Sequence, residues 1–204
     1  MYQKFVKRLI DIILSGMALL VLAPLIFIII IAIKIDDPGT AFFSQKRGGK
    51  DKTYFTMHKF RSMKMSTPHD VATHLLENPE QYITRVGRLL RKASLDELPQ
   101  VWDIFTGKMS IVGPRPALWN QFDLVEERDK YGANSVKPGL TGWAQINGRD
   151  TLKIPEKAKF DGEYAQNLSF AFDLKCFFRT IGSVFTRSGV VEGGTGEMGK
   201  RTKQ

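Results

Sequence analysis

The sequence predicts an α+β protein, mainly helical, with an N-terminal membrane helix, a small β-hairpin and several amphipathic or interfacial helices. Three observations lead to this class. Residues 12–33 carry no charge, two short β-rich stretches flank Gly48-Gly49-Lys50-Asp51, and helical periodicity recurs in the second half of the chain. We divide the chain into a membrane helix at 1–35, a folded domain at 36–188 and a Gly-rich, flexible tail at 189–204.

The charge balance narrows the class of partner. The chain has 204 residues, which suits one main domain, with 30 Lys+Arg against 21 Asp+Glu and a net charge of +9. Such an excess indicates a polyanionic partner: nucleic acid, an anionic membrane surface or phosphorylated substrates. The single cysteine, Cys176, excludes an internal disulfide and lies in an apolar helical stretch, so we expect it to be buried.

The uncharged run is long enough for a membrane. As a straight helix, its 22 residues would reach about 33 Å. Pro24 lies near its middle and removes a helix hydrogen bond, so we expect a kink that leaves each half too short to span. Lysines and arginines flank both ends, and such flanks prefer the cytoplasm. Two interpretations stay open: a re-entrant hairpin that enters one leaflet, and a Pro-kinked transmembrane anchor.

The next elements follow from turn signals and periodicity. Asp36-Asp37-Pro38-Gly39 ends the first helix, and residues 40–47 and 53–60 are expected to be strands of a hairpin. Residues 64–79 are polar and predict a loop. Residues 80–92 predict an amphipathic helix whose basic face is either solvated or bound to lipid head groups or substrate phosphates.

Helices also dominate the rest of the chain. Residues 117–131 predict an amphipathic helix with Trp119 and Phe122 packed in the core, the alternative being a seat in the membrane interface. Residues 136–149 are rich in Gly and Pro and predict a folded loop with polar site-lining residues. Residues 155–187 predict two further helices.

Two adjacent carboxylates, Asp96 and Glu97, stand at the centre of the chain. Basic residues, among them Arg88 and Arg91, precede them, and a rigid Gly113-Pro114-Arg115-Pro116 turn follows. One carboxylate can attack or take a proton, the other can hold a divalent metal, and arginines bind phosphate oxygens. This pattern indicates chemistry on a phosphate ester.

The same stretch also matches a capping box. Ser94 would cap a helix, and Glu97 would reach back to the Ser94 N–H. Taken alone, these residues favour a structural cap over a catalytic pair. Pro99 leaves either Ser94 or Asp96 as the cap. Consecutive helical residues point about 100° apart, so the two carboxylates would splay and take separate roles.

Six motifs in order give the chain a resemblance to the bacterial sugar transferase family. It is similar to the small monotopic polyprenol-phosphate phosphoglycosyl transferases, over about residues 1–188. One departure is Ala23-Pro24, where the family usually has Ser-Pro. The motifs are Lys7-Arg8-Leu9-Ile10-Asp11, Lys59-Phe60-Arg61-Ser62-Met63, Ser94-Leu95-Asp96-Glu97-Leu98-Pro99-Gln100, Gly113-Pro114-Arg115-Pro116, Lys137-Pro138-Gly139-Leu140-Thr141-Gly142-Trp143 and Asn147-Gly148-Arg149.

The resemblance implies a mechanism. The donor is a UDP-sugar, the acceptor undecaprenyl phosphate, and the products UMP and a polyprenyl-diphospho-sugar. Asp96 matches the nucleophile, which forms a covalent phosphosugar–aspartyl intermediate. Glu97 matches the residue that binds Mg²⁺, whose charge suits a diphosphate and whose preferred ligands are carboxylate oxygens.

The resemblance and the residue types together suggest a substrate-binding set. Arg88 and Arg91 are assigned to phosphates at the membrane face, and Arg115 to a phosphate or the uridine. Asn147 and Arg149 are candidates for nucleotide contacts. Lys59 and Arg61 either line the site or stabilise its fold. The full set is Arg88, Arg91, Lys59, Arg61, Arg115, Asn147 and Arg149.

The expected location is the cytoplasmic face of the bacterial inner membrane, with a monotopic helix in one leaflet. There the domain at 36–188 would catalyse the first membrane step of a glycoconjugate pathway such as exopolysaccharide synthesis. We expect no nucleic-acid partner, and aromatic residues on helix faces could serve a homodimer or the membrane. The competing class is a non-enzymatic, membrane-anchored basic module that binds anionic lipid or nucleic acid. It predicts that Asp96→Asn would leave function intact.

Overall fold

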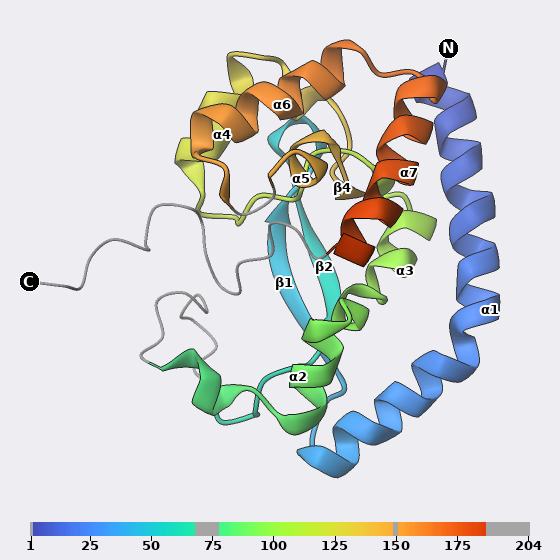
Figure 1. Ribbon diagram of the computed structural model, residues 1–204, viewed down its shortest axis with the longest axis vertical. Coiled ribbons are helices and arrows are strands. Elements are labelled where there is room, and N and C mark those ends of the chain that lie inside the picture. The colour runs from blue at the N-terminus through green and yellow to red at the C-terminus, as the bar shows by residue number, and fades with distance from the viewer. Residues whose placement is uncertain (1, 68–77, 149–150, 187–204) are drawn as a thin grey trace, which may run out of the picture.

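The computed structural model describes residues 2–67, 78–148 and 151–186. Figure 1 shows a mainly helical protein in which helices surround two small β-structures, as the sequence predicts. The elements, from the N-terminus, are a π-helical turn Tyr2–Val6, α1 Lys7–Asp36, β1 Phe42–Gly48, a 3₁₀ turn Lys50–Lys52, β2 Tyr54–Phe60, a 3₁₀ turn Pro79–Tyr82, α2 Arg85–Lys92, a 3₁₀ turn Leu95–Glu97, α3 Gln100–Phe105, β3 Ser110–Val112, α4 Phe122–Asp129, a 3₁₀ turn Ala133–Ser135, β4 Gly139–Thr141, α5 Trp143–Ile146, α6 Ile154–Gln166 and α7 Phe170–Thr186.

Helix α1 is long and apolar and leaves most of its surface uncovered. By length and composition it could cross a membrane, and only 11% of its most apolar 18-residue window is buried. The helix continues through Pro24, and Figure 1 shows it bending partway along its length. The expected kink is therefore present, and α1 lies along one side of the protein instead of projecting from it.

The N-terminal half of α1 is fastened to the folded domain by polar contacts. Lys7 forms a buried ion pair with Asp173 of α7 at 2.7 Å. Arg8 donates to the carbonyls of Ile104 and Phe105 at the end of α3, both at 2.7 Å. Asp11 accepts from the backbone N–H of Ile111 at 3.0 Å. The charged residues of the first motif therefore tie α1 to the domain.

The C-terminal half of α1 is fastened to the same domain. Ile29 and Ile33 join Phe60 and Leu90 in a buried apolar cluster. Asp36 accepts from the backbone N–H of Val86, in the first turn of α2, at 2.8 Å. Both ends of α1 are thus held by the same folded unit.

The predicted hairpin is confirmed, and a second β-pair was not foreseen. Strands β1 and β2 pair antiparallel from Phe42↔Phe60 to Gly48↔Tyr54. Strands β3 and β4 pair parallel, and a Cβ on Gly113 or Gly139, which end and begin this pair, would lie within 2.4 Å of the opposing backbone. Strand β4 lies in the stretch predicted to be a loop, and no strand was predicted at β3, because three-residue strands carry too little alternation to be recognised.

Two predicted helices and one predicted loop differ in the structure. In place of a helix over 80–92, a 3₁₀ turn is followed by α2, where the side chain of Thr84 caps the N–H of Gly87. In place of a helix over 117–131, α4 begins at Phe122. Trp119 and Phe122 are exposed and Leu124 is buried, so the expected core packing of the aromatics is wrong. Within 136–149, the expected loop contains β4 and α5.

The two C-terminal helices occur as predicted and complete the core. Tyr164 of α6 and Cys176 of α7 are fully buried beside Trp143. The hydroxyl of Tyr164 donates to the carbonyl of Val112 at 2.9 Å and contacts Asp173 at 2.7 Å. Asp173 of α7 therefore binds both Lys7 of α1 and the Tyr164 hydroxyl, which in turn reaches Val112 of β3. The predicted tail at 189–204 lies outside the described residues.

Candidate active site

The two carboxylates lie on the 3₁₀ turn Leu95–Glu97, which connects α2 to α3. Ser94 precedes them in the left-handed region, with φ 55°, and its side chain makes no capping hydrogen bond. Helix α3 begins only at Gln100, after Pro99, and has no side-chain cap. The capping-box interpretation is therefore wrong, because Ser94 does not adopt the extended conformation that a cap needs.

Glu97 is held by two cations from distant parts of the chain. Its Oε1 accepts from Lys59 Nζ of β2 at 2.8 Å and from Arg115 Nη2 at 2.9 Å. Burial by itself would raise the pKa of Glu97, but Arg115 and Lys59 outweigh it and hold the pKa well below its usual range. Glu97 therefore stays ionised at any physiological pH.

Asp96 lies in a different electrostatic environment although it is the next residue. Among the described residues it forms no ion pair, and burial raises its pKa above the ordinary value. Lys59 and Arg91 lower the pKa and the Glu97 charge raises it, yet burial is the largest of these effects. The two neighbouring carboxylates thus differ in their surroundings: Glu97 is ionised and ion-paired, whereas Asp96 is partly dehydrated and lacks an ion pair among the described residues.

The Gly113–Pro116 turn that carries Arg115 is anchored through its main chain. Gly113 donates to Thr141 O at 2.8 Å, and Gly139 donates to Pro114 O at 2.8 Å. The carbonyl of Arg115 accepts from Arg128 Nη2 at 2.9 Å. These contacts fix the backbone from which the Arg115 guanidinium reaches Glu97.

A buried ion pair, which no sequence pattern indicates, supports this turn. Arg128 of α4 donates from Nε and Nη2 to Asp161 Oδ2 of α6, at 2.8 and 2.6 Å. Both side chains are buried. Each residue looks like an ordinary polar position of an amphipathic helix, so only the packing of α4 on α6 reveals the pair.

A further cation near Glu97, Arg47, was not among the predicted site residues. Arg47 of β1 donates to the carbonyl of Pro116 at 3.2 Å and to Gln45 at 2.7 Å. Burial and the neighbouring Arg115 lower the pKa of Arg47 to about 10, while Glu97 raises it, so the side chain stays positively charged at neutral pH. In the sequence it is one of several cations after the apolar run, which hides its position.

Not all predicted binding residues gather at the dyad. Arg91 lies close enough to influence Asp96 and donates from Nε to Ser62 at 2.9 Å. Arg88 is exposed on α2. Arg61 is buried and binds both the carboxylate and the carbonyl of Asp37, so it stabilises the end of α1.

The last two predicted nucleotide ligands are not placed at the dyad either. Asn147 donates to the carbonyl of Trp143 at 2.7 Å and so closes the short helix α5. Arg149 lies outside the described residues.

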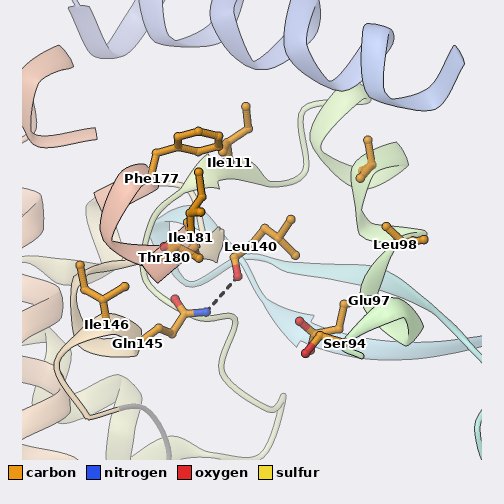
Figure 2. A pocket seen from close by; sticks show the side chains of 12 residues that line it. Ser94, Glu97, Leu98, Ile111, Leu140, Gln145, Ile146, Phe177, Thr180 and Ile181 are labelled. Carbon is orange, nitrogen blue, oxygen red and sulfur yellow. Dashed lines mark hydrogen bonds between the residues drawn. The ribbon is translucent and has the colours of Figure 1, made fainter. Parts of the chain in front are cut away.

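A pocket of about 240 Å³ opens beside Glu97. Figure 2 shows Phe177, Thr180 and Ile181 of α7 on one side of it and Glu97 with Leu98 on the other. Its lining consists of Ser94, Glu97, Leu98, Val101, Ile111, Leu140, Thr141, Gln145, Ile146, Phe177, Thr180 and Ile181.

The two carboxylates could hold a magnesium ion only together with ligands from outside the protein. Among the described residues there is no cluster of three or more His, Cys, Asp or Glu side chains that could hold a metal. Mg²⁺ is commonly held by one or two carboxylates together with water and substrate phosphates. Glu97, ionised and next to Asp96, would supply the carboxylate ligand in such an arrangement, and substrate phosphates and water would supply the others.

The structure thus places a carboxylate dyad, with cations around it, in a domain that carries a long apolar helix. The chain belongs to the bacterial sugar transferase family, whose family model matches residues 2–187. The resemblance found in the sequence motifs is thereby confirmed.

Individual relatives share most of this chain. It is 40% identical over 192 residues to the UDP-glucose:undecaprenyl-phosphate glucose-1-phosphate transferase of Escherichia coli, covering 88% of this chain and 40% of that protein. It is 38% identical to the uncharacterized sugar transferase EpsL of Bacillus subtilis, covering 90% of this chain and 89% of the relative. The exopolysaccharide production protein ExoY of Rhizobium meliloti is 35% identical, covering 87% of this chain and 84% of the relative. The chain thus spans well under half the length of the first of these relatives.

Proposed function

We propose that this protein transfers a sugar 1-phosphate from a UDP-sugar to a polyprenyl phosphate and releases UMP. The observation that carries the proposal is the asymmetry of the dyad: Glu97 is neutralised by Lys59 and Arg115, whereas burial raises the pKa of Asp96. A carboxylate that has lost part of its hydration without gaining an ion pair is a stronger nucleophile than a solvated one. Relatives named as glucose-1-phosphate transferases make UDP-glucose the first donor to test.

The reaction balances in two displacement steps. A carboxylate oxygen of Asp96 attacks the β-phosphorus of the UDP-sugar, and the bond from that phosphorus to the bridging oxygen breaks, releasing UMP. A phosphate oxygen of the acceptor then attacks the same phosphorus, and Asp96 leaves as a carboxylate. The product is the polyprenyl-diphospho-sugar. Asp96 must be ionised to begin, and it returns to that state at the end.

The surrounding side chains have separate roles in this scheme. Arg91 and Lys59 supply positive charge beside Asp96, where the phosphates would lie. Arg115 is half-exposed and donates from Nη2 to Glu97, which places its positive charge beside the dyad, where an incoming diphosphate would lie. A Mg²⁺ ion on Glu97 would neutralise charge on the diphosphate.

We also propose that α1 enters one leaflet and returns, so that the protein is monotopic at the cytoplasmic face of the inner membrane. The support is that polar contacts fasten both ends of α1 to the same domain, while its apolar surface between them is uncovered. Lys34 and the lysines and arginines after it lie on the same side as Lys7 and Arg8 in this arrangement.

The test is a UMP-release assay on purified protein in nanodiscs, with Mg²⁺, undecaprenyl phosphate and a panel of UDP-sugars. Release with one sugar, lost in Asp96→Asn and kept in the exposed-loop control Asp51→Asn, is the expected result. If folded protein binds no nucleotide sugar and releases no UMP, the transferase proposal is wrong. The competing class, a basic membrane-binding module, then becomes the better description.

A further inference from the structure

The pocket beside Glu97 is mainly hydrocarbon. Seven of its twelve lining residues are apolar, and they come from α3, β3, β4, α5 and α7 or adjoin them. Figure 2 shows Phe177 and Ile181 on α7, with Leu140 and Ile146 among the other apolar lining residues. The pocket therefore offers burial to an apolar group within reach of the carboxylate pair.

The polar side chains of the pocket are largely engaged with the protein. Thr180 donates to the carbonyl of Cys176 at 2.7 Å and meets the hydroxyl of Thr141 at 2.6 Å. Gln145 Nε2 donates to Leu140 O at 2.9 Å, whereas its buried Oε1 has no hydrogen-bond partner among the described residues. Apart from this acceptor and the Glu97 carboxylate, the lining offers few polar partners, so burying all the polar groups of a hexose or a uracil here would be costly.

The wall formed by α7 continues onto an exposed apolar surface. Phe177 and Ile181, which line the pocket, are 41% and 43% exposed, and Phe170, Leu174 and Phe178 of the same helix are also exposed. Figure 1 shows α7 beside the N-terminal half of α1, whose own apolar residues are uncovered. An apolar chain resting on this surface can enter the pocket without crossing water.

We propose that the pocket receives the phosphate-proximal isoprenoid units of the polyprenyl phosphate acceptor. The acceptor phosphate then lies at the Glu97 end of the pocket, next to the cations around Asp96. This inference rests on the proposed function and assigns the pocket to the acceptor, with the donor bound elsewhere on the dyad. The covalent scheme makes the assignment testable, because donor and acceptor react in separate half-reactions.

The variant Ile181→Trp narrows the pocket from the α7 side. The matched control is Phe178→Trp, on the same exposed face of α7 but outside the lining. Full-length protein in nanodiscs is assayed in two ways. UMP–UDP-sugar exchange without acceptor reports the first step, and product formation against acceptor concentration, with geranyl phosphate and undecaprenyl phosphate, reports the second.

For Ile181→Trp we expect the exchange rate to stay within about 2-fold of wild type. The KM for both acceptors should rise about 10-fold, as the loss of burial for two or so methylene groups implies. Phe178→Trp should leave both quantities unchanged. Slower exchange, or a higher KM for the UDP-sugar, would assign the pocket to the donor and overturn the inference, as would an unchanged acceptor KM. Absence of exchange in the wild type would instead reject the proposed function.

Discussion

The guanidinium of Arg128 donates to the main-chain carbonyl of Arg115 across 2.9 Å. Because Asp161 holds the same guanidinium, a buried ion pair between α4 and α6 determines where the Arg115 turn lies relative to Glu97. The Arg115 turn is thus held in place by two residues, Arg128 and Asp161, that form no hydrogen bond with Glu97.

Weakening this support should slow the reaction more than it unfolds the protein. Arg128→Lys keeps a charge opposite Asp161 but loses the fork that also reaches Arg115, so we expect UMP release to fall about 10-fold or more. The KM for the donor should rise, because Arg115 is misplaced. Thermal melting and steady-state kinetics measure both effects, with the exposed Lys130→Met as the control. An unchanged kcat and KM in a folded variant would contradict the positioning role.

The Asp161 side of the pair should matter for stability. Asp161→Asn leaves the buried Arg128 without a counter-charge, a change that typically costs about 3–5 kcal/mol. Urea unfolding of the variant and the wild type gives the difference directly. A loss below about 1 kcal/mol would mean that water reaches Arg128 in the variant.

The acid limb of the pH–rate profile should report Asp96. The pKa of this carboxyl is raised, so the first half-reaction should fall off above the ordinary Asp value of about 3.9 as the pH is lowered. Arg91 lowers that pKa, so Arg91→Gln should move the limb to still higher pH. Arg85→Gln, an exposed change on the same helix, should not. Coincident limbs in wild type and Arg91→Gln would show that another group limits the rate.

Asp96→Asn should separate activity from stability. Because burial raises the pKa of Asp96, ionising it destabilises the folded state, and this cost is present above the folded pKa and vanishes as the pH falls below the unfolded value. The variant should therefore melt at the same or a higher temperature than the wild type at pH 7, and the gap should close under acid. A lower melting temperature at pH 7 would show that the carboxylate has a stabilising partner.

Glu97→Gln should have the opposite effect on stability. It leaves Lys59 and Arg115 facing a neutral group, and we expect a loss of about 1–3 kcal/mol at pH 7. The pKa of Glu97 is lowered, so its contribution is complete above the unfolded value of about 4.3 and is lost only as the pH falls through the folded pKa. Unfolding curves for both proteins at pH 7 and at the lowest tolerated pH measure this. A difference that grows under acid would contradict the assignment.

Thiol labelling can test the path of α1. The native Cys176 is fully buried and burial raises its pKa to about 12, so it should stay unlabelled in folded protein. Cysteines placed at Gln3 and at Thr40, both exposed and on either side of α1, should react with an impermeant reagent from the same face of a vesicle. A cysteine at Leu20 should be protected. Labelling of the two ends from opposite faces would establish a spanning helix.

The sequence predicted correctly those elements that depend on neighbouring residues in the chain. The helices at 154–166 and 170–186, the hairpin and the bend at Pro24 follow from periodicity, turn residues and the missing proline N–H. The predicted capping box does not form, because Ser94 adopts a left-handed backbone conformation and α3 begins only after Pro99.

The site was predictable only in part because its contacts are long-range. Glu97 pairs with residues 38 positions before it and 18 after it, and the motifs indicated these partners without their geometry. Arg61 belongs to the same motif as Lys59, yet it binds Asp37 at the far end of α1. No local pattern marks Arg128 and Asp161, since a buried pair between two helices looks like two surface charges until the helices are packed.

The double attachment of α1 has a consequence for how the protein would meet its acceptor. Lys7 with Asp173 at one end and Asp36 with Val86 at the other make the helix and the domain a single body. With α1 seated in a leaflet, the height and tilt of Asp96 above the lipid are set once, by the fold. A lipid acceptor diffusing in the membrane plane would then find the site at a fixed distance from the membrane surface. Its encounter with the protein would be a two-dimensional diffusion process.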